Sequence, residues 1–172
     1  MQRLRAQLRP TYCVPMRADC DERHHAWPLF LEAYAVVVDL LDSELRRERG
    51  LPLAWFDVLV ALAGAPEGRL AMNQLSDSVL LSKSGVTRLV DRMARAGLVA
   101  RASCPSDRRV VFARLTPQGR VAFRRAAPVA FRGVAEHFAA HLSAAEEQAL
   151  AAAFTRMIRA GRARRGALRA AM

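Results

Sequence analysis

Cysteine and aromatic residues are scarce in this chain of 172 residues, which contains 3 cysteines and only 6% aromatics. Cys13, Cys20 and Cys104 are too few and too scattered for a disulfide framework or a four-thiolate zinc site. The sequence also lacks a run of about 18 apolar residues, so we expect no membrane-spanning helix. The first twenty residues hold four arginines and no apolar segment, so we expect no secretory signal and a reducing, cytoplasmic location.

The sequence also lacks the short motifs that mark the common enzyme classes. It has no glycine-rich phosphate loop, no H-E-x-x-H pair and no nucleophile elbow, so we expect no enzyme activity. His137 and His141 lie four residues apart on an expected helix, but no cluster of Cys, Asp or Glu joins them in the sequence, and two ligands do not make a site. The sequence therefore predicts no metal site and no cofactor.

Positive charge, by contrast, is abundant and concentrated in one third of the chain. The sequence has 27 Lys and Arg against 16 Asp and Glu, a net charge of +11. The net charge is −2 over residues 1–68, +9 over residues 69–125 and +4 over residues 126–172. This balance suits a polyanionic partner, nucleic acid before an anionic membrane surface. The C-terminal arginines lack the large apolar face of a membrane-surface helix, so we expect no membrane partner.

Two apolar helices are predicted ahead of the basic segment. Apolar residues recur at steps of four and three from Trp27 to Leu45, which predicts a helix over 27–49 with one apolar face. Gly50 follows as the residue that ends it. Residues 53–63 are apolar almost all round, which predicts a buried central helix.

A short helix and a longer helix are predicted next, separated by a tight break. Residues 72–79 suffice for two turns, and Ser82 can cap a helix over 83–96 because its hydroxyl can accept an amide hydrogen bond. Val86, Leu89, Val90 and Met93 form an apolar stripe on the longer helix. The opposite face is polar and basic: Lys83, Ser84, Thr87, Arg88, Asp91, Arg92 and Arg95. This order predicts a helix-turn-helix.

The apolar period then changes from that of a helix to that of a strand. Residues 98–102 and 110–115 predict two short strands, and the turn-rich loop between them carries Arg108 and Arg109. Residues 69–71 are a candidate for a third, very short strand. The sequence therefore predicts a β-hairpin with a basic tip, which is called a wing in DNA-binding proteins.

Two further helices are predicted after the hairpin. Thr116 is a good N-cap for a helix that extends to about His141. Ser143 and Glu146 form a capping box that opens the last helix. Residues 161–172 are rich in arginine and alanine, and we expect them to fray.

These elements predict a mainly α fold with a small β-wing. A winged helix-turn-helix core over 68–116 is flanked by dimerisation helices over 27–49 and 117–160. Residues 1–26 are expected to form a flexible arm or a short helix, and 161–172 an Arg/Ala-rich tail. The apolar faces of the flanking helices have no partner in the core, which favours a homodimer over a monomeric bundle.

Two longer motifs run through these elements: LSKSGVTRLVDRMARAGLV over Leu81–Val99 and PSDRRVVFARLTPQGR over Pro105–Arg120. They resemble the MarR (multiple-antibiotic-resistance regulator) family of bacterial winged-helix transcription factors. Each is moderately specific alone, and the combination at this spacing is strongly specific. For a MarR-type domain over 27–160, the resemblance implies a homodimer that binds a palindromic operator in double-stranded DNA. It also implies a repressor that a small aromatic or anionic ligand releases from DNA.

The residues themselves indicate how such a helix would read DNA. The amino end of a helix favours phosphate because its free amides and dipole are positive, and Ser82, Lys83 and Ser84 lie there. Thr87 and Arg88 lie one turn further in, within reach of base edges, and arginine suits guanine. We expect these five residues to bind DNA.

Arg92 and the wing complete the predicted DNA-binding residues. Arg92 suits a phosphate or an internal ion pair equally well. Asp107 is expected to orient Arg108 or Arg109 for a narrow minor groove, where arginine reads shape and potential. The alternatives are a solvated loop for the wing arginines and ion pairs with Asp57 or Asp91 for Arg88 and Arg92.

Trp27, Asp57, Arg88 and Arg92 are the candidates for a ligand pocket or for its coupling to DNA. Asp57 interrupts an apolar helix, and a buried carboxylate needs a partner, for which Arg88 and Arg92 are candidates. Resemblance to urate-responsive members implies a similar Asp–Arg link, but Trp27 does not match their tryptophan in spacing. A structural ion pair is therefore the preferred interpretation of Asp57.

Two alternative functions stay open from the sequence. Cys104 lies in the predicted wing, so its oxidation would disturb the wing of a redox-sensing regulator. A nonspecific architectural DNA-binding protein would carry the same excess of positive charge. Affinity for an operator relative to random duplex discriminates the second alternative from a sequence-specific regulator.

Overall fold

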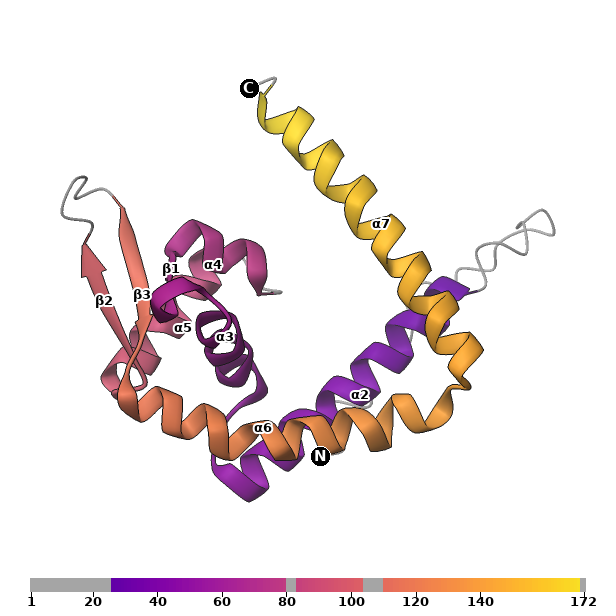
Figure 1. The fold of residues 1–172 in the computed structure, drawn as a ribbon, viewed down its shortest axis with the longest axis horizontal. Helices are drawn as coiled ribbons and strands as arrows, with labels where there is room; N and C mark the ends of the chain where they lie inside the picture. Colours follow the sequence, from indigo (N-terminus) through magenta and orange to yellow (C-terminus); the bar gives the residue numbers. More distant parts are fainter. Residues whose placement is uncertain (1–25, 80–82, 104–109, 171–172) are drawn as a thin grey trace.

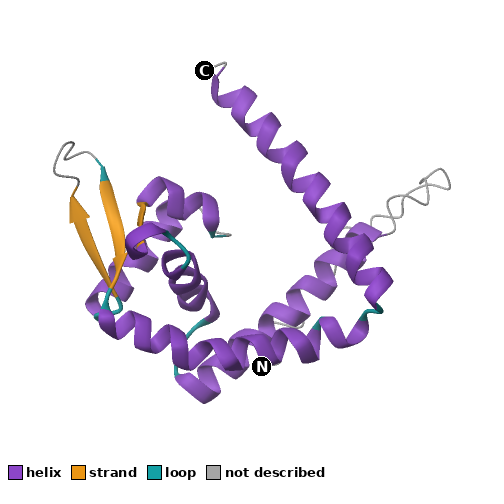
Figure 2. Ribbon diagram, in the orientation of Figure 1, coloured by secondary structure: helices purple, strands orange, loops and turns teal. Residues whose placement is uncertain are grey.

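The computed structural model describes residues 26–79, 83–103 and 110–170, and it is dominated by helices around one small sheet (Figures 1 and 2). None of the helices in these ranges is both long enough and apolar enough to span a bilayer. In chain order the elements are α2 (Ala26–Arg49), α3 (Leu53–Ala63), η2 (Pro66–Gly68), β1 (Arg69–Ala71), α4 (Met72–Ser78), α5 (Lys83–Arg95), β2 (Val99–Ser103), β3 (Val111–Leu115), α6 (Pro117–His137), η3 (Ala139–His141) and α7 (Ala144–Ala170).

The hydrophobic core lies where α3 and α5 meet the sheet and the first half of α6. The helix α3 buries Phe56, Val58, Leu59 and Leu62, as its nearly uniform apolar character predicts. The apolar stripe of α5 is buried along its whole length, with no member more than 3% exposed: Val86, Leu89, Val90 and Met93. Both helix predictions are confirmed.

The sheet has three antiparallel strands in the order β1-β3-β2. Arg69 of β1 pairs with Arg114 of β3, and Val99 of β2 pairs with Leu115 of β3. The predicted hairpin and the third strand are therefore present. With α4 and α5 beside them, they form the winged helix-turn-helix that the sequence predicts.

The two flanking parts of the chain come together outside this core. The helix α6 leaves the foot of the sheet and packs along α2, and α7 then projects away from the body (Figure 1). Phe30 of α2 contacts Phe154 of α7 with ring centroids 5.7 Å apart. The helix α7 extends through Ala170, so the segment that we expected to fray continues the helix.

Most of the predicted helix ends are confirmed by their hydrogen bonds. Gly50 has φ 64°, the left-handed conformation that glycine adopts at low cost. Thr116 Oγ1 accepts a hydrogen bond of 2.9 Å from the Gly119 amide, and Glu146 accepts one of 2.8 Å from the Ser143 amide. The end of α6 differs, because the backbone leaves the helical region after His137 and the 3-10 helix η3 follows.

The start of α3 depends on a carboxylate from another helix. Pro52 precedes α3 and makes no side-chain cap. Asp42 of α2 takes this role: its Oδ1 accepts a hydrogen bond of 2.8 Å from the Leu53 amide, and its Oδ2 accepts one from Arg46. Desolvation raises the pKa of Asp42, but these hydrogen bonds and the charge of Arg46 outweigh it, so the pKa lies below its usual value.

Asp42→Ala is expected to lower the free energy of unfolding by about 1 kcal/mol at pH 7, since it removes a helix cap. An aspartate with a lowered pKa stabilises the fold above its unfolded pKa of about 3.9, and this contribution disappears as the pH falls through the lower folded pKa. Urea denaturation between pH 7 and pH 2.5 measures the difference from wild type. Asp39→Ala, an exposed aspartate on the same helix, is the matched control. A difference that stays constant with pH would contradict the assignment.

Candidate nucleic-acid interface

The buried stripe of α5 determines which side of this helix faces solvent. Because Val86 and Val90 point into the core, Ser84, Thr87, Arg88 and Arg92 lie on the exposed side. The structure therefore brings these four predicted DNA-binding residues onto one face. Ser82 and the Lys83 side chain lie outside the described part of the chain.

The guanidinium groups of Arg88 and Arg92 make no ion pair with any described residue. Asp91, a predicted partner for them, pairs instead with Arg101 of β2 and so links α5 to the hairpin. Sequence reasoning missed this link, and the signal for it was Arg101, an arginine without an assigned role in the first strand of the hairpin. Arg88 and Arg92 thus keep their charge available on the exposed face.

Asp57 departs from the sequence-based expectation. Its side chain lies on the exposed side of α3, and across the described ranges no cation lies within ion-pair distance of it. The expected ion pair with Arg88 or Arg92 is therefore not formed. Val60, one turn further along α3, is also exposed at 43%, so Asp57 lies on the outward side of this helix. Partial desolvation by surrounding atoms still raises the pKa of Asp57 above its usual value.

The hairpin places its loop at the end of the sheet that lies away from α6. The last strand pair is Ser103 with Val111, whereas Val99 with Leu115 lies beside α6. The predicted tip residues Asp107, Arg108 and Arg109 fall outside the described residues, as does Cys104. Their roles in minor-groove binding and in redox sensing therefore stay predictions.

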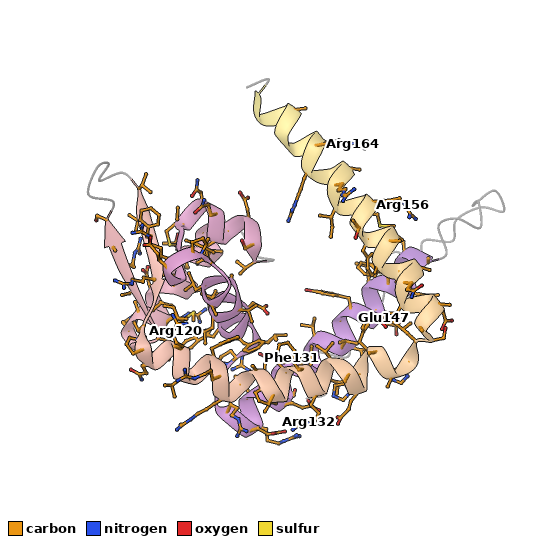
Figure 3. All side chains as sticks on the ribbon, viewed as in Figure 1. Arg120, Phe131, Arg132, Glu147, Arg156 and Arg164 are labelled. Atoms are coloured by element: carbon orange, nitrogen blue, oxygen red, sulfur yellow. The ribbon has the colours of Figure 1, made fainter. Side chains whose placement is uncertain are left out.

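The sheet and the adjoining start of α6 carry further arginines that sequence reasoning did not single out. Arg69 stacks over the Phe112 ring at 5.3 Å from its centroid. A hollow of about 560 Å³ at the foot of the sheet is lined by three more, Arg114, Arg120 and Arg124, and Figure 3 labels Arg120 in this region. The excess of positive charge over residues 69–125 was the feature of the sequence that could have indicated these arginines.

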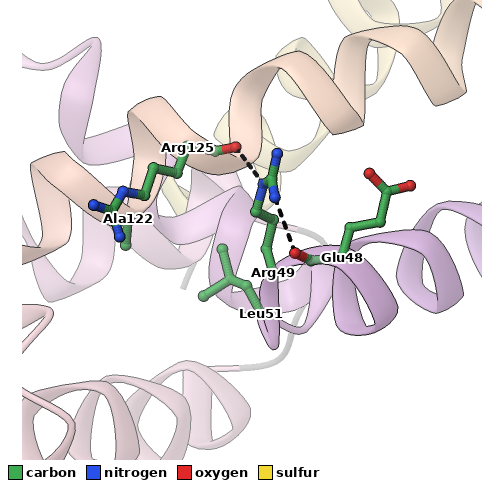
Figure 4. Close-up of a pocket in the computed structure, with 5 residues that line it drawn as sticks. All are labelled: Glu48, Arg49, Leu51, Ala122 and Arg125. Atoms are coloured by element: carbon green, nitrogen blue, oxygen red, sulfur yellow. Dashed lines mark hydrogen bonds between the residues drawn. The ribbon is translucent and has the colours of Figure 1, made fainter.

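A second, smaller hollow of about 350 Å³ lies where the end of α2 meets α6, and Figure 4 shows its lining: Glu48, Arg49, Leu51, Ala122 and Arg125. Arg49 donates hydrogen bonds to the backbone oxygens of Arg125, at 2.9 Å, and of Glu48, at 3.0 Å. Trp27, a candidate for the ligand pocket, lies at the opposite end of α2 with its ring 5.9 Å from that of Phe30. The structure does not bring Trp27 together with Asp57, Arg88 or Arg92.

Comparison with known proteins gives similarities to transcriptional regulators, both in sequence and in structure. The model of the MarR family matches residues 49–110. The HTH-type transcriptional regulator MhqR of Bacillus subtilis (strain 168) is 32% identical over 87 residues, which are 51% of this chain and 58% of MhqR. The chain thus spans little more than half the length of this curated relative.

Two solved structures are similar over much more of their length. Sco3205 of Streptomyces coelicolor, a MarR family transcriptional regulator solved in complex with DNA, is 32% identical with a TM-score of 0.73, covering 79% of this chain and 85% of that chain. BpsR of Bordetella bronchiseptica, whose DNA binding is regulated by 6-hydroxynicotinic acid, is 26% identical with a TM-score of 0.68, covering 77% and 97%. With this identity and coverage added to its winged helix-turn-helix, the chain belongs to the MarR family of transcriptional regulators.

Proposed function

We propose that this chain is a sequence-specific transcriptional regulator that binds a palindromic operator in double-stranded DNA as a homodimer. The observation that carries the proposal is the exposed face of α5, where Arg88 and Arg92 have no ion-pair partner among the described residues. This face lies next to a hairpin in the part of the chain that carries a net charge of +9. The DNA complex of Sco3205 supports the same partner for a similar fold.

Each part of the interface has its own contribution to binding. Arg88 lies where an arginine can donate two hydrogen bonds to guanine, which discriminates between bases by about 1–3 kcal/mol. Arg92 and the arginines of the hairpin neutralise phosphates, a contribution that depends on salt and not on sequence. The proposal therefore assigns specificity to α5 and most of the remaining affinity to the hairpin.

The proposed dimer covers apolar side chains that a single chain leaves in water. They occupy α2, α6 with its C-cap, and α7, outside the winged core: Trp27, Leu29, Phe30, Tyr34, Val36, Leu40, Phe131, Val134, Phe138, Met157 and Ile158. A monomer rarely exposes so many large apolar residues on neighbouring helices. A second copy of the same surface would bury them and would place two α5 helices about one turn of DNA apart.

We further propose that the protein acts as a cytoplasmic repressor that a small aromatic or anionic ligand releases from DNA. The regulation of BpsR by 6-hydroxynicotinic acid supports this part of the proposal. The hollow between α2 and α6 also lies where a dimerisation helix meets the helix that leads to the hairpin. A ligand that binds one arrangement of these helices better than another would change the population that fits DNA.

Selection of bound sequences from a random duplex library tests the proposed function. We expect a palindromic motif with half-sites about 10 bp apart. Binding to the selected operator is then compared with binding to random duplex at about 150 mM salt, where we expect at least a thousandfold preference. Equal affinities would show a nonspecific architectural protein instead.

Arg88→Ala and Arg109→Ala are expected to weaken binding in different ways. Loss of a bidentate base contact at Arg88 should lower operator affinity by about 10-fold or more and relax the preference at one base pair of each half-site. Loss of Arg109 should weaken binding to all sequences and reduce its salt dependence. Fluorescence anisotropy with operator variants separates the two effects. The control is Arg162→Ala on α7, and wild-type specificity in Arg88→Ala would exclude the base contact.

A further inference from the structure

One carboxylate oxygen is left without a partner in the interior between α2 and α6. Glu44 of α2 has a side chain that is 15% exposed, and its Oε1 lies 2.7 Å from Nε2 of His137, which is 20% exposed. Its other oxygen, Oε2, is buried and has no hydrogen-bond partner among the described residues. A buried carboxylate oxygen without a partner is costly, so this oxygen is available to a hydrogen-bond donor or a cation.

The neighbourhood of this oxygen is rich in groups that bind metal ions. One donor atom from each of Glu44, Glu136 and His137 lies within 4.8 Å of the others. Glu136 is exposed, so the cluster opens to solvent on one side and offers an entry path. The three groups come from two different helices, which fixes their separation through the packing of α2 on α6.

The close approach of the two helices depends on a glycine. A Cβ at Gly133 would lie 2.6 Å from Leu41 Cδ2 and 2.9 Å from Glu44 Oε2. Only a residue without a side chain therefore lets the Glu44 carboxylate sit directly against α6. The position of Oε2 beside Gly133 is thus a property of the helix packing.

We propose that Glu44, Glu136 and His137 bind a divalent transition-metal ion of the zinc class. One imidazole nitrogen and two carboxylates are a donor set that zinc and its neighbours accept, with water completing the coordination. Nε2 of His137 faces Oε1 of Glu44. A cation that both carboxylate oxygens of Glu44 share would also satisfy Oε2. The site joins α2 to α6, so the ion links a proposed dimerisation helix to the helix that reaches the hairpin.

Arg132 is the positive group that faces this site. One of its terminal nitrogens lies 2.6 Å from Glu48, whereas its Nε lies 4.0 Å from Glu136. Its closer contact is therefore with Glu48, which leaves Glu136 available to a metal ion. Arg132→Gln removes a repulsive charge and is expected to tighten metal binding.

The sequence alone did not predict this site, because Glu44 and His137 are 93 positions apart. The pair that did suggest a metal, His137 and His141, is not the pair that the structure brings to the cluster. His141 thus offers a matched control, since it is a histidine on the neighbouring element η3. The proposal does not depend on DNA binding, so it can fail or succeed independently of the proposed function.

The test is the metal stoichiometry of the full-length protein after chelator treatment. Co²⁺ is titrated at pH 7.5 and followed by its visible absorption, and Zn²⁺ is then titrated by calorimetry. We expect one more ion per chain in wild type and in His141→Gln than in His137→Gln or Glu44→Gln. Because cysteines and histidines elsewhere also bind metals, this difference between variants is the measured quantity. We also expect Zn²⁺ to raise the Tm of wild type more than that of His137→Gln.

Glu136 is exposed, so Glu136→Gln should fold even if Glu44→Gln and His137→Gln do not, and it tests the metal site independently of them. It is expected to weaken the affinity of the site by at least ~10-fold, the loss that even an outer-sphere partner causes. Equal stoichiometry and affinity in wild type, His137→Gln and Glu136→Gln would overturn the proposal. So would a wild-type protein that binds neither ion.

Discussion

Gly119→Ala is expected to lower the free energy of unfolding by about 3 kcal/mol, a large effect for one added methyl group. A Cβ at this position would lie 2.0 Å from the backbone oxygen of Leu98 and 2.9 Å from Leu115 Cδ1. Neither neighbour can move freely. The Gly119 amide donates to Thr116 Oγ1, and the Thr116 amide donates to the same Leu98 oxygen at 3.2 Å. The methyl group would therefore separate α6 from the start of the hairpin.

Gly161→Ala provides the matched control for this substitution. Gly161 lies in the exposed helix α7, and a Cβ there meets nothing within 4 Å. Alanine is the better helix former, so this variant should gain about 0.5–1 kcal/mol. Urea denaturation followed by circular dichroism measures both variants. Equal stability of Gly119→Ala and wild type would show that the close contact with Leu98 does not exist in solution.

Phe131→Glu is expected to dissociate the proposed dimer and to lower operator affinity by about 100-fold or more. Phe131 is 66% exposed on α6, and it projects from a different side of the helix than Arg132 (Figure 3). Burying a phenylalanine contributes about 1.5–3 kcal/mol, and a two-fold interface loses each contact twice. A glutamate in its place would also be desolvated without a partner. In a monomer the two α5 helices are no longer linked, so binding of the first half-site no longer raises the effective concentration of protein at the second.

Analytical ultracentrifugation at micromolar concentration and anisotropy with the selected operator measure these two effects. Phe131→Leu is the control, because it keeps an apolar side chain and should stay dimeric with nearly unchanged affinity. The free energy of unfolding of each variant shows that the chain still folds. A dimer that persists in Phe131→Glu would place the interface elsewhere on the molecule.

The parts of the fold that follow from local interactions were predictable. A helix cap such as Thr116, a left-handed glycine such as Gly50 and the stripe of α5 depend on residues within a few positions of one another. Their physical cause is contained in a short segment, so the sequence pattern is sufficient. The exposed positions of Arg88 and Arg92 follow from the same stripe.

The contacts between distant segments were not predictable in the same way. Asp57 was expected to be buried because its neighbours are apolar, yet the packing of α3 leaves Asp57 and Val60 on its outward side. The Asp42 cap on α3, the Asp91–Arg101 pair and the Glu44–His137 contact each depend on how two elements approach. Periodicity gives the faces of a helix, and it does not give the distance or the rotation between two helices.

The helix α6 continues through the internal Pro128, and its length has a mechanical consequence. Its 21 residues run from the foot of the hairpin to the contact with α2, a length of about 31 Å at 1.5 Å per residue. A tilt of only about 5° at the α2 end would displace the other end by roughly 3 Å, close to the 3.4 Å rise between neighbouring nucleotides. If α6 moves as one rod, such a tilt near α2 would shift the hairpin by close to one base-pair step at the proposed operator.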